Sequence, residues 1–227
     1  MIASLATFFR DGGPFMWVNL AVLTAALATI AERVIMVMFR FSIDGKAFMA
    51  QVQKLILANN VDRAIKLCAA APNAALARVV KAGLMKAHRN HREVARALEE
   101  AVIEITPQVS QRIPGLWSLA NVATLVGLIG TIVGLIGTFR GLGAATPELK
   151  QAMLSKGISE AMYNTAFGLM IAVGCILAHM LLMGKAKSLI EEIEFHSLRL
   201  ENMLAQQEGG GGGEPHPETT PPPQHPA

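Results

Sequence analysis

Three long apolar runs restrict this chain to a membrane fold more than any other feature of its sequence. They occupy residues 14–39, 113–139 and 161–184, and the second and third contain no Asp, Glu, Lys or Arg. A helix needs about 20 such residues to cross the hydrocarbon core of a bilayer. The sequence therefore predicts an all-α membrane protein with three transmembrane helices. Glu32 and Arg33, the charged pair in the first run, are expected to lie near one membrane interface and to reach out of it.

The charges between these runs predict how the chain crosses the membrane. Residues 40–112 hold twelve Lys or Arg against six Asp or Glu. Loops rich in Lys and Arg remain on the cytoplasmic side. Residues 40–112 and 185–207 are therefore expected in the cytoplasm, whereas residues 1–13 and a loop of residues 140–160 are expected on the opposite side.

The segments outside the membrane divide into helices and a tail. Apolar residues recur at helical spacing in four places between residues 40 and 112, which predicts a helical cytoplasmic domain of short helices. Apolar and charged residues alternate over residues 185–207, which predicts that the third span continues as a cytoplasmic helix. Residues 208–227 are rich in Gly and Pro and are expected to be disordered.

Composition and motifs exclude several classes of function. The net charge of +3 gives no electrostatic support for nucleic-acid binding. The sequence shows no nucleophile beside a base, no cluster of metal ligands and no phosphate-binding loop. We therefore expect neither an enzyme nor a cofactor or metal site.

Small and polar residues follow one side of the second run. The glycines on one helix face are Gly127, Gly130, Gly134, Gly137 and Gly141. Beside them, a second stripe consists of Thr124, Thr131 and Thr138, spaced seven residues apart. Two interpretations stay open. The hydroxyls line a hydrated path, or the threonines bond their own backbone carbonyls while the glycines pack against another helix.

The third run has a matching strip. Its members share a narrow arc of the helix and are Ala161, Thr165, Gly168, Ala172, Cys175 and His179, with Asn164 at the margin. Glu160 comes directly before this run, where an acid at a helix N-terminus is favourable whatever its function. We interpret His179 as a packed neutral histidine in preference to a water-exposed portal residue, and a part in proton exit stays open.

The runs contain no carboxylate at mid-depth. Proton transfer across a bilayer normally uses a group that titrates inside the membrane, and the hydroxyl stripes offer none. If this chain moves protons, the proton carrier must therefore come from a partner helix.

Two segments carry a resemblance to a known family. The strings GLIGTIVG at residues 127–134 and GISEAMYNTAFGL at residues 157–169 resemble the signature segments of the MotA/TolQ/ExbB proton channel family. The three-span layout with a large cytoplasmic segment is similar to the ExbB and TolQ branch, and less so to the four-span MotA branch. The resemblance covers about residues 10–205.

The resemblance implies a proton-driven motor in a bacterial inner membrane. Such subunits form a homopentamer whose pore is lined by the second and third spans. An ExbD/TolR-like single-span partner places a membrane aspartate in that pore. Thr131 and Thr165 match the family's pore threonines, and Glu160 matches a glutamate with a gating or structural role.

The work would be done on an envelope protein of a TonB-, Tol-Pal- or gliding-motility system. The alternative is a passive membrane scaffold subunit of a transport complex. Departures from the family pattern occur at Ala123 and Thr124, where similar proteins often have Ala-Pro, and at Tyr163 and Asn164, where smaller or less polar residues are usual. They suggest a divergent branch.

Overall fold

A computed structural model describes residues 13–143 and 146–210, and these residues form helices and no strands. In chain order the elements are α2 (Pro14–Ile35), the π-helix η1 (Met36–Arg40), α3 (Gly45–Leu57), α4 (Val61–Ala70), α5 (Ala75–Leu84), α6 (His91–Ser110), α7 (Ile113–Leu142) and α8 (Pro147–Gly210). Three stretches of helix are long and apolar enough to cross a membrane, and each contains one of the predicted runs. The prediction of an all-α membrane protein with three spans is confirmed.

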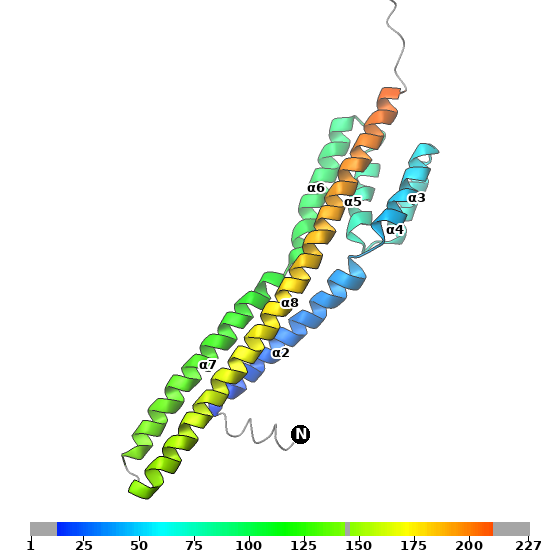
Figure 1. The fold of residues 1–227 in the computed structure, drawn as a ribbon. Helices are drawn as coiled ribbons and strands as arrows, with labels where there is room; N and C mark the ends of the chain where they lie inside the picture. The colour runs from blue at the N-terminus through cyan, green and yellow to red at the C-terminus, as the bar shows by residue number, and fades with distance from the viewer. Residues whose placement is uncertain (1–12, 144–145, 211–227) are drawn as a thin grey trace, which may run out of the picture.

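The three spanning helices lie side by side at one end of an elongated molecule (Figure 1). α7 packs along α8 over most of its length, and α2 lies against both. Large apolar side chains point away from this bundle, among them Leu125, Ile132 and Met170. Inside it, small residues such as Ala123 and Ala172 are buried. This arrangement suits a bilayer, because lipid tails solvate the outer apolar side chains and the helices associate through close packing.

The other end of the molecule is a domain in which α3, α5 and α6 contact the second half of α8, and α4 packs on α3 and α5 (Figure 1). Its core consists of larger aliphatic side chains, and Val52, Ile56, Val80 and Leu84 are almost fully buried there. The Asp44 side chain caps α3 by accepting a hydrogen bond of 3.1 Å from the Ala47 backbone amide. The four short helices match the four apolar patterns of the sequence.

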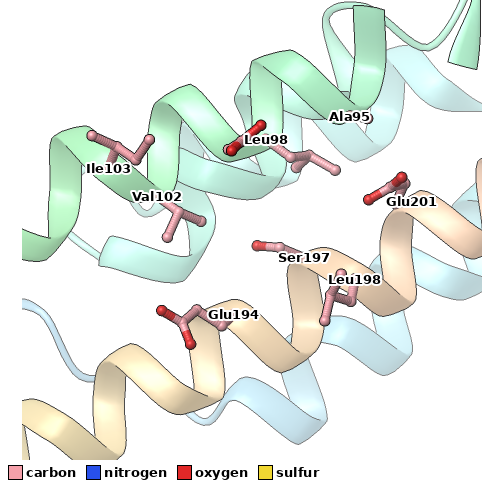
Figure 2. Close-up of a pocket in the computed structure, with 9 residues that line it drawn as sticks. Ala95, Leu98, Val102, Ile103, Glu194, Ser197, Leu198 and Glu201 are labelled. Carbon is pink, nitrogen blue, oxygen red and sulfur yellow. The ribbon is translucent and has the colours of Figure 1, made fainter. Parts of the chain in front are cut away.

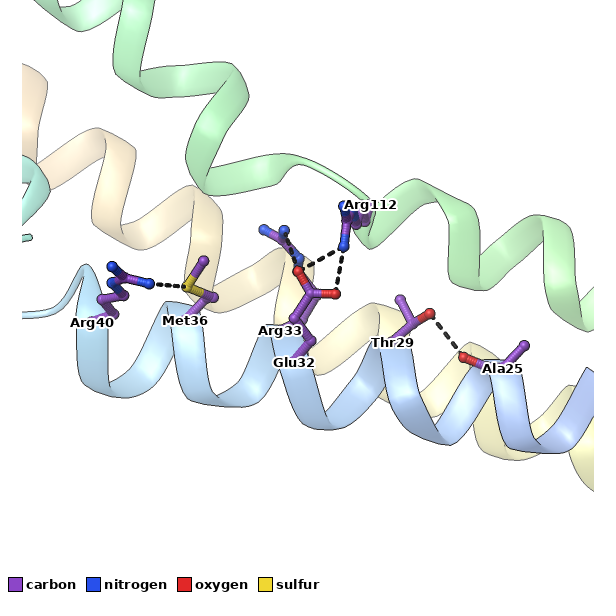
Figure 3. A network of polar contacts seen from close by, with 7 residues as sticks. All are labelled: Ala25, Thr29, Glu32, Arg33, Met36, Arg40 and Arg112. Carbon is purple, nitrogen blue, oxygen red and sulfur yellow. Dashed lines mark hydrogen bonds and ion pairs between the residues drawn. The ribbon is translucent and has the colours of Figure 1, made fainter.

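A charged cluster ties α2 to the junction of α6 and α7 (Figure 3). Arg112 adopts a left-handed conformation with φ of 61° and separates the two helices. Its guanidinium lies 2.6 Å from the Glu32 carboxylate, which also pairs with Arg33 at 3.3 Å. The expectation that Arg33 reaches out of the membrane is wrong, because its side chain is only 2% exposed. Arg33 lies seven residues beyond Ala26 and fourteen beyond Asn19, so it shares the inward face of α2.

The expected loop of residues 140–160 is mostly helix. α7 continues to Leu142, and α8 begins at Pro147 and passes through the third span without a break. The sequence favours this, because proline is tolerated in the first turn and Glu, Leu, Lys, Gln, Ala and Met follow it. The predictions for residues 1–12 and 211–227 lie outside the described residues, while residues 208–210 still belong to α8.

A groove of about 500 Å³ lies between α6 and the second half of α8 (Figure 2). Leu98, Val102 and Leu198 contribute apolar surface to it, and Glu194 and Glu201 contribute carboxylates. It belongs to the α3–α6 end of the molecule and is separate from the polar residues of the spans.

Candidate functional site

Glycines bring α7 and α8 together along one line, which we call the seam. A Cβ atom added at Gly168 would lie 2.6 Å from the Ala123 carbonyl oxygen and 3.2 Å from the Gly127 Cα. A Cβ atom added at Gly127 would lie 3.3 Å from the Thr165 Cα. Real Cβ atoms do not sit so close to backbone, so the two helices can approach this closely only where side chains are missing.

The hydroxyls of Thr131 and Thr165 meet at this seam. Their Oγ1 atoms are in direct contact across the two helices. The Thr131 hydroxyl is also placed to donate to the carbonyl of Gly127 at 3.0 Å or of Ala161 at 3.3 Å, and Thr165 to the Gly127 carbonyl at 3.1 Å. Both residues stay partly exposed in the single chain. The structure therefore places these two threonines together and leaves one side of the pair open.

Thr124 and Thr138 differ from Thr131 in their hydrogen bonds. Thr124 donates to the Ala120 carbonyl at 3.0 Å and Thr138 to the Gly134 carbonyl at 2.9 Å, both within α7. Thr138 also lies close to α8, since a Cβ atom added at Gly157 would be 2.7 Å from the Thr138 Cβ. The threonine stripe is therefore half-buried along the seam, and its middle member is the one that bonds α8.

The remaining predicted glycines have unequal surroundings. A Cβ atom at Gly130 would lie 2.9 Å from the Phe15 Cβ of α2, and it would also overlap the Asn164 amide. A Cβ atom at Gly134 would meet the Ala161 Cβ at 3.5 Å, which is ordinary contact. A Cβ atom at Gly137 would meet nothing within 4 Å, so Gly137 packs no helix within this chain.

Glu160 lies inside a helix and not at a helix start. α8 begins thirteen residues earlier, at Pro147, so the expected helix N-terminus effect does not apply to this carboxylate. Glu160 is half-buried and lines a cavity of about 60 Å³ together with Asn164 and Phe15. Its Oε1 atom lies 3.1 Å from where a Cβ of Gly13 would be, so it also contacts the start of α2.

One polar residue of this region was not predicted from the sequence. That residue, Asn19 on α2, is fully buried, and Asn164, predicted at the margin of the α8 strip, is 2% exposed. Within the described residues, the Asn19 Oδ1 and Nδ2 and the Asn164 Oδ1 have no hydrogen-bond partner. A polar residue inside an apolar run is the signal that could have identified Asn19, because such residues face a bundle interior far more often than lipid.

His179 lies further along α8 and packs against the start of α7. Its Nδ1 atom is 3.0 Å from the Ile113 carbonyl oxygen, and its ring lies 6.1 Å from the Trp117 ring. A carbonyl oxygen can only accept a hydrogen bond, so Nδ1 carries the proton in this contact. This placement agrees with the interpretation of His179 as a packed histidine.

The seam can solvate and relay a charge more readily than it can hold one. Its hydroxyls each offer one donor and two acceptor lone pairs and do not titrate near neutral pH. Among the described residues, no group of three His, Cys, Asp or Glu side chains is arranged to hold a metal ion. The chemistry available at the seam is therefore hydrogen bonding, in which each hydroxyl can donate once and also accept.

Comparison with known protein families gives a match. The family model described as the MotA/TolQ/ExbB proton channel family matches residues 71–195, which is more than half of the chain. The matched region runs from the end of α4 through α7 and most of α8, so it includes Thr131, Thr165 and Glu160. No curated protein matches the chain.

Proposed function

Because this chain belongs to the MotA/TolQ/ExbB proton channel family, we propose that it is the channel-forming stator subunit of a motor that turns proton-motive force into mechanical work. The observation that carries the proposal is the contact between the Thr131 and Thr165 hydroxyls across α7 and α8. Two hydroxyls that meet inside the membrane can hydrogen-bond a group that carries a proton across it.

The proton carrier in this proposal is a carboxylate of a second protein. The seam supplies hydroxyls, and the three predicted spans contain no carboxylate at mid-depth. A single-span partner of the ExbD/TolR type, with an aspartate in its helix, would place that group beside Thr131 and Thr165. Deprotonated, the aspartate would accept hydrogen bonds from both hydroxyls, and protonated, it would donate to one of them.

The pore in this proposal is closed by further copies of the chain. Thr131 and Thr165 are only half-buried in one subunit, so something else must cover their open side. The same holds for the large apolar side chains of α7 and α8 that are exposed in the single chain. A ring of copies, which we take to be a pentamer, would shelter the threonines around the partner helix while lipid covers the outer apolar side chains.

The orientation in this proposal follows from the distribution of charge. The α3–α6 domain carries an excess of Lys and Arg and would lie in the cytoplasm of a bacterial inner membrane. The start of α2, which Glu160 contacts, would then face the opposite side. The work would be delivered to an envelope protein of a TonB-, Tol-Pal- or gliding-type system.

Proton uptake by the purified complex tests this function. The chain is purified with its native partner, reconstituted into liposomes, and exposed to a membrane potential while internal pH is recorded. We expect potential-driven uptake that Thr165→Val reduces at least tenfold, because valine keeps the shape and removes the hydroxyl. Thr165→Ser should retain most of the uptake. Thr24→Val is the matched control, because the Thr24 hydroxyl bonds only the Ala21 carbonyl of its own helix.

A passive membrane scaffold is the competing function, and one observation favours it. Every threonine hydroxyl at the seam has a backbone carbonyl in reach, so each can be satisfied without any proton pathway. A scaffold predicts no potential-driven uptake and full tolerance of Thr165→Val, with the complex still assembled.

A further inference from the structure

A second polar site lies inside each subunit, on the side of α8 that faces α2. Glu160, Asn164 and Gly168 are spaced four residues apart, so they stack along one face of α8. At the third level the polar group comes from α2, because the Asn19 Nδ2 lies 3.3 Å from where a Cβ of Gly168 would be. The result is a column of a carboxylate followed by two amides, enclosed by α2, α7 and α8.

The amides of this column are buried without protein partners. Asn19 is 0% exposed and Asn164 is 2% exposed. Within the described residues, three of their four side-chain polar atoms make no hydrogen bond. A buried amide that lacks a partner is unfavourable, and in folded proteins such groups are normally satisfied by ordered water.

The first two levels of the column open on a cavity large enough for water. The cavity has a volume of about 60 Å³ and is lined by Glu160, Asn164 and the apolar residues Phe15 and Val133. One water needs roughly 10–15 Å³ of such volume and two or more polar partners, so there is space for a small cluster. The carboxylate and the Asn164 amide supply those partners at the cavity wall.

We propose that Glu160, Asn164 and Asn19 hold a chain of internal water molecules within each subunit, on a separate side of α8 from the Thr131–Thr165 pair. The water accepts hydrogen bonds from the amide nitrogens and donates to the amide and carboxylate oxygens. The presence of this water does not depend on the proposed function. A role of the water in supplying protons does rest on the proposed function.

Asn164 directly precedes the seam residue Thr165. Neighbouring residues on a helix point about 100° apart, so the Asn164 amide lies against Gly130 of α7 beside Phe15 of α2, while the Thr165 hydroxyl meets Thr131. The third member comes from α2, outside the region that matches the family.

Water contact can be measured directly in bilayers. The full chain, with asparagine and alanine labelled with ¹⁵N, is studied in lipid by water-edited solid-state NMR, which reports how fast magnetisation passes from water to each amide. We expect the signal transferred from water to the side-chain amides of Asn19 and Asn164 to build up nearly as fast as at Asn59, which is exposed. Build-up as slow as that of the buried Ala123 backbone amide would overturn the proposal.

A variant provides a second, independent test. Asn164→Leu fills the cavity with an apolar side chain, so the Asn19 amide should lose at least half of its rate of transfer from water. Met162→Leu is the matched control, because Met162 is 64% exposed on the same helix and lines no part of the cavity. An unchanged rate at Asn19 in Asn164→Leu would count against a connected chain of water.

The result of the hydration experiments can be distinguished from the result of the proton-uptake test. Dry amides together with a Thr165→Val defect would overturn this site and leave the motor function standing. Hydrated amides in a complex that takes up no protons would support the water chain and overturn its part in proton supply. If both proposals hold, Asn164→Leu should lower proton uptake several-fold while Met162→Leu leaves it unchanged.

Discussion

The two ends of this molecule are held together by opposite kinds of residue. In the α3–α6 domain, the buried positions are large aliphatic side chains such as Val52, Ile56 and Leu84, which water drives together. At the α7–α8 seam, small residues such as Ala123, Gly127 and Ala172 are buried, and many large aliphatic side chains of both helices point outward. In lipid, burying an apolar side chain gains little free energy, so the helices are held together by close backbone packing and hydrogen bonds.

This difference explains where a polar function can reside. The core of a water-soluble domain excludes polar groups unless each one has a partner. The seam instead brings backbone carbonyls and two hydroxyls together, because glycine removes the side chains that would separate them. The glycine-packed seam is therefore the part of the chain that can place a row of polar groups across the apolar core of a bilayer.

Removing atoms from the domain core should have the largest effect on stability. Leu84 is fully buried, so Leu84→Ala should lower the free energy of unfolding by about 2–5 kcal/mol, through lost burial and the cavity left behind. Leu57→Ala is the control, because Leu57 is 71% exposed and should change stability by no more than about 0.5 kcal/mol. Denaturation in detergent measures both. Equal effects would mean that the domain is not held by this core.

Adding atoms to the seam should be the next largest effect. Gly168→Ala places a Cβ against the Ala123 carbonyl and should destabilise α7–α8 packing by about 1–3 kcal/mol. Gly174→Ala adds the same methyl group to the same helix, where nothing lies within 4 Å, so it should be neutral or slightly stabilising. Unfolding by SDS titration compares them. If Gly168→Ala left stability unchanged, the claim that the seam depends on missing side chains, unlike the domain core, would be contradicted.

The charged cluster between the two ends should give a smaller, graded effect. Arg112 and Glu32 are half-exposed, so Arg112→Gln should lower stability by about 1 kcal/mol or less. Glu32→Gln should cost about 1 kcal/mol more than that, because it also leaves the buried Arg33 guanidinium without its carboxylate. The same SDS titration ranks the two variants, and the reverse order would show that Arg33 does not depend on Glu32.

Cys68 should report the dryness of the domain core, and its titration should leave stability independent of pH near neutrality. Burial raises the pKa of its thiol from 9.0 to about 11, partly offset by a backbone hydrogen bond and by Lys81. The raised pKa favours the neutral thiol, so its contribution is fully present below pH 9 and declines as the pH rises towards 11. Alkylation by iodoacetamide at pH 8 should be far slower in the folded chain than after denaturation. Equal rates would indicate an open core.

Hydropathy and helical periodicity predicted the elements of the fold well. The apolar runs predicted the three spans, because lipid exposure requires apolar side chains over about 20 residues. The four helices of the domain followed from apolar residues such as Val52 and Leu98, which recur on one face of each helix. Helix over residues 147–160 was not predicted, because this segment was interpreted as a connection between two apolar runs.

Hydropathy and helical periodicity predicted only part of the candidate site. The threonine and glycine stripes placed Thr131 and Gly127 on neighbouring positions, but only the resemblance singled out Thr131 and Thr165. Arg33 and Asn19 were misjudged or missed because hydropathy does not fix the rotation of a helix about its axis. That rotation is set by packing of α2 against α7 and α8, which a single apolar run does not encode.

A double-mutant cycle in the proton-uptake assay tests the central claim most directly. If the Thr131 and Thr165 hydroxyls act as one unit, Thr131→Val and Thr165→Val should each reduce potential-driven uptake at least tenfold, and the double variant should be no worse than either. Uptake that stays at the wild-type rate in both single variants, in a complex that still assembles, would contradict the claim.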